Sequence, residues 1–172
     1  MMNTFANIEL EIIDQTAWLR LNRPQVRNAF NEDMMNELKK AFRQVDQDQS
    51  LRALVIRGNG PVFSAGADLQ WMKQTVDNTY EQNMQESGQL QELFESLYQL
   101  AVPTITVVHG ACIGGANGLA AASDMVLAEQ QTQFRFSEVR IGQVPATIAP
   151  FVLRRMSEYA AKYYMLTGRV FR

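Results

Sequence analysis

The sequence predicts a single α/β domain in which strands and helices alternate, and three observations carry this prediction. Short apolar runs recur along the chain, segments with helical spacing of apolar residues lie between them, and no linker, repeat or low-complexity tract interrupts the pattern. Of the 172 residues, 47% are hydrophobic and 20% are charged, which is the usage of a folded domain with its own core.

The first strands and the first helix are predicted within residues 8–46. Apolar and polar residues alternate over 8–12 and again over 17–21, which predicts a β-hairpin. Asn31 has the character of a helix N-cap and is followed by two acidic residues. Apolar residues at helical spacing then continue the helix to about Asp46.

Buried strands and further helices are predicted from residue 51 onwards. The apolar runs at 51–57 and 104–108 are typical of strands that are buried on both faces. Apolar residues at helical spacing over 90–100 predict an amphipathic helix between them. The remaining predictions are a small-residue helix within 114–123, a short strand at 124–128 and a mostly helical segment from residue 146.

Charge and cysteine content argue against several classes of function. The net charge is −2 and no run of Lys or Arg exceeds two residues, so no nucleic-acid partner is expected. The single cysteine, Cys112, cannot form an intramolecular disulfide, and we expect it to be a small buried side chain and not a nucleophile or metal ligand. Because no signal-peptide pattern or membrane-length apolar stretch occurs, a cytoplasmic protein without a membrane partner is expected.

Two glycine-containing stretches, 63–69 and 109–118, each follow a buried strand. Glycine lets the backbone approach a ligand closely, and a helix start offers unpaired N–H groups. Neither stretch matches a phosphate loop or the dinucleotide fingerprint. From the residues alone, each is either a tight turn with close helix–strand packing or part of a site where two N–H groups converge on one oxyanion.

These stretches closely resemble signatures of the crotonase superfamily, which contains enoyl-CoA hydratases and isomerases. The matching segments, in the family's order and across essentially the entire chain, are 21–30, 63–69, 104–115, 123–124 and 134–145. The resemblance implies the crotonase fold, a spiral of ββα units, with residues 1–172 forming one acyl-CoA-binding catalytic core. It also implies that the chain stops before the C-terminal helices that complete the site wall and build trimers.

The resemblance further implies a site for acyl-CoA thioesters. The backbone N–H groups of Ala67 and Gly115 would hold an enolate oxygen, and Glu138 would be the acid/base. The residues implied to line the CoA cleft, largely through their backbone, are Asn28, Ala29, Ala65, Gly66, Asp68, Leu69, Gln70, Gly114 and Gly118. The coenzyme A thioester is the substrate, and neither a metal nor another cofactor is implied. The full-length protein is expected to form a homotrimer or hexamer.

One departure from the family pattern bears on the reaction. The best-known hydratases use two glutamates, and the first of these falls at Gly118 in this chain. One carboxylate suffices for a double-bond isomerase, whereas hydration also requires an oriented water. Asn117 is either a second polar group for that purpose or a helix-start residue. Without the resemblance, Glu138 would be interpreted as a surface carboxylate.

Finer resemblance favours a branched acyl group. Residues 68–72 and 137–152 are similar to bacterial 3-methylglutaconyl-CoA hydratases of leucine breakdown and their isohexenylglutaconyl relatives, which also carry glycine at the first-glutamate position. Their substrates have an additional carboxylate, so Arg140 and Arg154 are either its partners or solvated surface charges. The expected function is hydration of a branched enoyl-CoA. The alternatives are a Δ3,Δ2-enoyl-CoA isomerase or other one-glutamate crotonase, and a truncated non-catalytic acyl-CoA-binding or assembly fragment.

Overall fold

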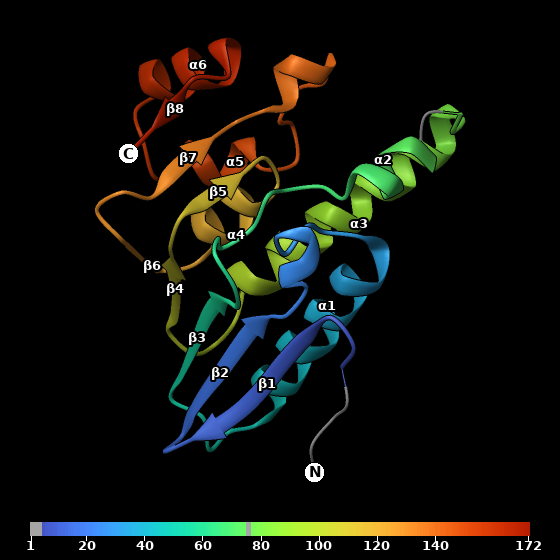
Figure 1. Cartoon of the computed structure of the whole chain (residues 1–172). Helices are drawn as coiled ribbons and strands as arrows, with labels where there is room; N and C mark the ends of the chain where they lie inside the picture. The colour runs from blue at the N-terminus through green and yellow to red at the C-terminus, as the bar shows by residue number, and fades with distance from the viewer. Residues whose placement is uncertain (1–4, 75–76) are drawn as a thin grey trace.

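Two sheets with helices packed between and around them form the molecule (Figure 1). The computed structural model describes residues 5–74 and 77–172, so the part of the signal-peptide prediction that falls on residues 1–4 lies outside the described residues. The larger sheet has the strand order β1-β2-β3-β4-β6, and the smaller has the order β5-β7-β8. The strands are β1 (Ile8–Ile13), β2 (Thr16–Leu21), β3 (Ala53–Gly58), β4 (Thr104–Val108), β5 (Ala111–Ile113), β6 (Met125–Ala128), β7 (Gln133–Arg135) and β8 (Val170–Phe171). The α-helices are α1 (Glu32–Gln47), α2 (Leu69–Gln74), α3 (Tyr80–Tyr98), α4 (Ala116–Ala122), α5 (Ala149–Val152) and α6 (Glu158–Thr167), and the 3-10 helices are η1 (Pro24–Val26) and η2 (Glu138–Ile141).

The predicted N-terminal hairpin is confirmed. Strands β1 and β2 are antiparallel, with Ile8 opposite Leu21. Asp14 and Gln15 form the turn with φ of 47° and 63°. A two-residue turn with both φ values positive matches the twist of the strands that it joins. The pairs β2–β3, β3–β4 and β4–β6 are parallel, so the chain must cross over between them, which it does through helices.

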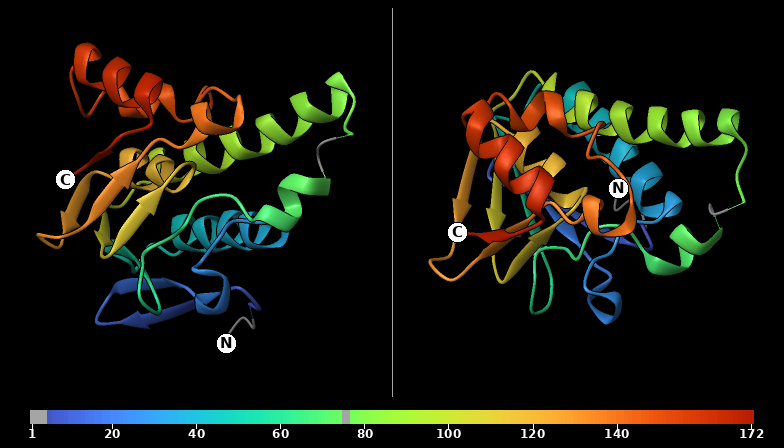
Figure 2. Two further views of the ribbon diagram at one scale, coloured as in Figure 1. Left: turned by 45° about the horizontal axis from the view of Figure 1, so that its top comes forward. Right: turned by 90° about the horizontal axis from the view of Figure 1, so that it is seen from above.

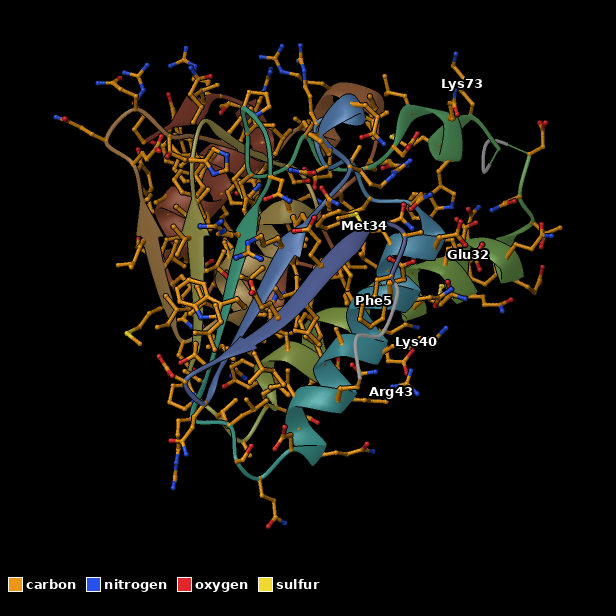
Figure 3. All side chains as sticks on the ribbon, turned by 60° about the horizontal axis from the view of Figure 1, so that its bottom comes forward. Phe5, Glu32, Met34, Lys40, Arg43 and Lys73 are labelled. Carbon is orange, nitrogen blue, oxygen red and sulfur yellow. The ribbon has the colours of Figure 1, made fainter. Side chains whose placement is uncertain are left out.

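Helix α1 begins where the sequence predicts. The Asn31 side-chain oxygen accepts a hydrogen bond from the Met34 N–H at 3.0 Å, which caps the first turn. Met34 is fully buried, whereas Glu32, Lys40 and Arg43 are exposed on the outer side of the helix (Figure 3). The apolar stripe of α1 therefore supplies a large part of the core under the sheet.

Helix α3 is longer than predicted. It begins at Tyr80 instead of near Leu90, because Thr79 and Gln82 form a capping box. The Thr79 hydroxyl accepts from the Gln82 N–H at 3.3 Å, and the Gln82 side chain accepts from the Thr79 N–H at 2.8 Å. The first turns of α3 project from the rest of the molecule beside α2 (Figure 2). Its apolar half enters the core, where the buried residues are Leu93, Phe94 and Leu97.

Helix α4 is the small-residue helix of the sequence, and all of its residues are buried. It packs against β4, β5 and β6 and also touches α3 and α5. The Arg155 guanidinium closes its C-terminal end by donating to the backbone oxygens of Ala121, Ser123 and Asp124. Small side chains are therefore needed here because strands and helices approach α4 from several sides.

The last segment contains two helices, a turn between them and a short terminal strand. Helices α5 and α6 confirm the prediction for the residues after 146, but β8 was not predicted and pairs antiparallel with β7. Helix α6 and β8 lie at the end of the molecule away from β1 (Figure 1 and the left view of Figure 2). In the part of the chain that the structure describes, no helix is long and apolar enough to cross a membrane.

Candidate active site

The two glycine-containing loops lie side by side. The Ser64 N–H donates to the Ala111 oxygen at 3.1 Å, and the Ile113 N–H donates to the Ser64 oxygen at 3.1 Å. Two residues beyond Ser64, a Cβ on Gly66 would lie 2.7 Å from the Ile113 oxygen, and Gly66 has φ +90°. Only glycine permits this close approach in that conformation. The loops are therefore in contact immediately before the two predicted oxyanion donors.

The N–H group of Ala67 points away from Phe30, the residue that pairs with it in a parallel bridge. The Phe30 N–H donates to the Gly66 oxygen at 2.7 Å, and the Asp68 N–H donates to the Phe30 oxygen at 2.8 Å. Successive peptide groups in extended backbone point in opposite directions. The Ala67 N–H consequently faces away from Phe30, and within residues 5–74 and 77–172 no acceptor bonds to it.

Gly115 presents a second N–H group at the N-terminal end of α4. The preceding Gly114 N–H donates to the Arg135 oxygen at 2.9 Å, whereas the Gly115 N–H has no acceptor among the described residues. A Cβ added to Gly115 would meet no described atom within 4 Å, so the space beside it is open. Both Ala67 and Gly115 are half-buried, so a ligand can reach them.

The carboxyl group of Glu138 lies beside the same loop. A Cβ on Gly114 would lie 3.5 Å from Glu138 Oε1. Glu138 Oε2 is buried and has no hydrogen-bond partner in the described structure. Burial raises the pKa of Glu138, and the backbone N–H groups of Ser137 and Glu138 oppose this only in part. Without the family resemblance, sequence reasoning would place Glu138 on the surface, but the structure buries its carboxyl oxygen Oε2 in a position that suits the acid/base role that the resemblance implies.

Asn28 differs from the prediction that it lines the CoA cleft, because its polar groups are used within the chain. It is fully buried, and its side-chain oxygen accepts from the Arg23 N–H at 2.9 Å. Its backbone oxygen accepts from the Ser64 hydroxyl at 2.7 Å, and its backbone N–H donates to the Arg23 oxygen. Its side-chain amide donates to the oxygens of Asn59, Val62 and Phe63. Asn28 therefore anchors the first glycine-containing loop and offers no free polar group to a ligand.

Asp68 is also paired internally. Its Oδ2 lies 3.0 Å from Arg23 Nη1, and its Oδ1 accepts from the Gln70 N–H at 2.9 Å, at the start of α2. Desolvation acts to raise the pKa of Asp68, but the hydrogen bonds from Gln70 and Arg23 outweigh it and lower that pKa. Of the other predicted lining residues, Ala29 and Gly66 are buried, Ala65 is half-buried, and Leu69 and Gln70 are exposed.

Gly118 faces the core and not an open pocket. A Cβ at this position would lie within 2.6 Å of three atoms of the Phe94 ring, which is itself fully buried. The ring thus fills the space where a longer side chain at position 118 would begin. Sequence reasoning missed this role of Phe94, because an apolar residue on an amphipathic helix is indistinguishable from any other core residue.

The two arginines considered for a substrate carboxylate are on the surface. Arg154 stacks on the Tyr98 ring, with its guanidinium carbon 4.6 Å from the ring centroid, and also donates to the Tyr98 hydroxyl. Arg140 is exposed on η2, two residues after Glu138. Arg154 therefore already has a partner within the chain.

A separate hollow lies away from Glu138. It has a volume of about 400 Å³ and is lined by residues near the carboxyl ends of β3, β4 and β6, including Arg57, His109 and Glu129. We place the candidate active site at Glu138 instead, because there the described residues leave a buried carboxylate oxygen and two N–H groups without a partner.

Comparison with known proteins identifies chains that this one is similar to. A family model described as enoyl-CoA hydratase/isomerase matches residues 11–172. A Thermus thermophilus protein named for enoyl-CoA hydratase activity is 36% identical over 150 residues, which is 87% of this chain and 59% of that protein. The trans-2-decenoyl-[acyl-carrier-protein] isomerase of Streptococcus mutans is 33% identical over 88% of this chain and 58% of its own length.

The solved structures confirm the predicted fold class. The enoyl-CoA hydratase from Shewanella pealeana superposes with a TM-score of 0.95 at 36% identity, covering 97% of this chain and 63% of that one. The chain thus spans about three fifths of the length of these relatives.

Proposed function

Because the chain belongs to the enoyl-CoA hydratase/isomerase family, we propose that it acts on enoyl-CoA thioesters with Glu138 as its single acid/base. The observation that carries this proposal is the buried, unpartnered Oε2 of Glu138, beside a loop that carries a free N–H group in the described structure. The Ala67 and Gly115 N–H groups are the proposed donors to the thioester oxygen. Each such donor is worth about 3–4 kcal/mol in comparable sites.

The proposed reaction is hydration. The Glu138 carboxylate takes a proton from a water molecule as the water oxygen bonds to Cβ of the enoyl group. The electron pair of the double bond then moves through Cα onto the thioester oxygen, where the two N–H groups stabilise the enolate. Protonated Glu138 next delivers its proton to Cα, which restores the carboxylate. One carboxyl group thus serves first as base and then as acid, and no metal or further cofactor takes part.

A branched acyl group with its own carboxylate, as in 3-methylglutaconyl-CoA, is the proposed substrate. The proposal is supported by the similarity of residues 68–72 and 137–152 to hydratases for such substrates. Exposed Arg140, two residues after Glu138, is the proposed partner for the additional carboxylate. For the full-length protein we further propose a homotrimer or hexamer in the cytoplasm.

A second candidate is a double-bond isomerase, and a specific observation favours it. The Phe94 ring closes the space beside Gly118, so the described site has one carboxyl group and an apolar wall where a second acid would be needed. In this reaction Glu138 removes a proton from Cα of a β,γ-enoyl thioester and returns it to the γ-carbon. The similarity to the isomerase of Streptococcus mutans agrees with this alternative.

Absorbance of the conjugated thioester separates these functions. Hydration of 3-methylglutaconyl-CoA lowers this absorbance, whereas isomerisation of a β,γ-enoyl-CoA raises it. The Glu138→Gln variant should lose either activity, and Glu129→Gln, which removes a carboxylate at an exposed position, should keep it. Full turnover by Glu138→Gln would refute the assignment. No reaction of the wild-type chain with either substrate would refute the activity and favour a non-catalytic fragment.

A further inference from the structure

The two peptide groups that carry the proposed donors are both held through their carbonyl oxygens. The Gly66 oxygen belongs to the same peptide group as the Ala67 N–H, and it accepts from the Phe30 N–H at 2.7 Å. The Gly114 oxygen belongs to the same peptide group as the Gly115 N–H. A hydrogen bond to the carbonyl end of a peptide fixes its plane and polarises its N–H, which strengthens that N–H as a donor.

The second of these carbonyl groups is held by a side chain. Asn117 Nδ2 donates to the Gly114 oxygen at 2.9 Å, and the Asn117 N–H donates to the same oxygen at 3.0 Å. The same Nδ2 also donates to the Arg135 oxygen at 2.9 Å. Since both partners are carbonyl oxygens, which only accept, the amide must present its NH2 group to them.

The contact with Arg135 connects Asn117 to the acid/base as well. The Arg135 oxygen also accepts from the Gly114 N–H at 2.9 Å, so it joins the end of β7 to the start of α4. Three residues after Arg135 the chain reaches Glu138. Asn117 is itself buried, at 4% exposure, and the N-cap position of α4 is held by Gly115. Asn117 therefore lies in the first turn of α4, which confirms the helix-start interpretation, but it is not the N-cap and does not face open solvent.

We propose that Asn117 is a positioning residue, which holds the Gly114–Gly115 peptide in its donor orientation and joins it to the segment that delivers Glu138. This inference rests on the proposed function, because it assigns Asn117 to the oxyanion donor of that reaction. A purely structural role would affect stability alone. A positioning role also changes the polarisation of the bound thioester carbonyl and lowers kcat, because misplacing the donor removes more stabilisation from the transition state than from the ground state.

The test measures carbonyl polarisation separately from turnover. In a Glu138→Gln background, the carbonyl stretching frequency of bound 3-methylglutaconyl-CoA is recorded by difference Raman or infrared spectroscopy. Asn117→Ala removes both side-chain hydrogen bonds, and Asn117→Asp removes them at nearly constant volume. The matched control is Ser123→Ala, at the other end of α4, because the buried Ser123 hydroxyl donates to the Leu119 oxygen at 2.9 Å.

We expect the control to keep the lowered frequency of the bound thioester carbonyl and both Asn117 variants to lose most of the shift. With Glu138 restored, the Asn117 variants should lose roughly 10- to 100-fold in kcat, while KM changes by about twofold or less. An unchanged shift and kcat in a folded Asn117 variant would overturn the inference and leave the proposed function intact. No shift in the Glu138→Gln protein that carries Asn117 would overturn the proposed function itself.

Discussion

Replacing Gly118 by alanine should destabilise the protein, although alanine is the better helix former. In a helix interior this substitution ordinarily gains about 1 kcal/mol. At position 118, however, the new Cβ would lie within 2.6 Å of three Phe94 ring atoms, so the ring would have to retreat by roughly 1 Å to reach ordinary contact. The Phe94 ring is fully buried and packs edge-on against Phe151, with centroids 6.1 Å apart.

Overpacking of such a core costs about 1–3 kcal/mol, and the direct collision with three ring atoms places Gly118→Ala near the upper end. After subtraction of the helix-propensity gain, the expected net loss in unfolding free energy is about 2 kcal/mol. Gly88 in α3 supplies the control, because a Cβ there would meet no described atom within 4 Å. Gly88→Ala should therefore stabilise the protein by about 1 kcal/mol.

Urea denaturation of a double-mutant cycle tests the reasoning. Phe94→Leu shortens the side chain that collides with position 118, so Gly118→Ala should cost less in the Phe94→Leu background than in the wild type. The coupling free energy is expected to be about 1–2 kcal/mol. If Gly118→Ala stabilises the chain as much as Gly88→Ala does, or if the two core substitutions are additive, the packing argument is wrong.

Two further predictions concern Glu138 and Asn28. The pKa of Glu138 is raised in the folded state, so folding favours the neutral carboxyl group. The stabilisation from this neutral form is fully present below the ordinary carboxyl pKa of about 4.3. It is lost as pH rises through the folded-state pKa. Glu138→Gln should therefore increase the unfolding free energy at neutral pH and change it little near pH 4, and a gain that is the same at both pH values would contradict this. Asn28→Gly should cost about 2–3 kcal/mol through lost buried hydrogen bonds, and Asn28→Ala about 1 kcal/mol more, because Asn28 has φ +53°. Thermal or urea unfolding measures both losses, and equal losses for glycine and alanine would show that the backbone conformation contributes nothing.

Much of the fold follows from periodicity in the sequence. The β1–β2 hairpin, α1 and the buried strands β3 and β4 have strong patterns over several residues, and the structure places them within a few residues of the prediction. Strands β5, β7 and β8 have three residues or fewer, so they contain too little periodicity to detect. The start of α3 has no apolar stripe, but its capping box at Thr79 and Gln82 was a signal that could have located it.

For the candidate site, the sequence predicted the position of the loops but not the contacts of their side chains. The glycine-containing loops indicated where backbone could meet a ligand, and the structure brings both loops together next to Glu138. The partners of Asn28 and Phe94 could not be predicted, because each depends on contacts between segments that are distant in the sequence. The oxyanion role of Ala67 and Gly115 and the catalytic role of Glu138 stay predictions until activity is measured.

Two parallel bridges affect how the reaction at such a site can change during evolution. They join Phe30 to Ala67 and Ser64 to Cys112. The proposed donors and most of their anchors are main-chain groups, so many side chains around them can be exchanged without moving the donors. Acyl selectivity and the number of acid/base groups can then change during evolution while the two N–H donors stay in place. A chain built in this way is able to acquire a new reaction through changes at a few positions such as 94 and 118, which lie beside the donors without holding them.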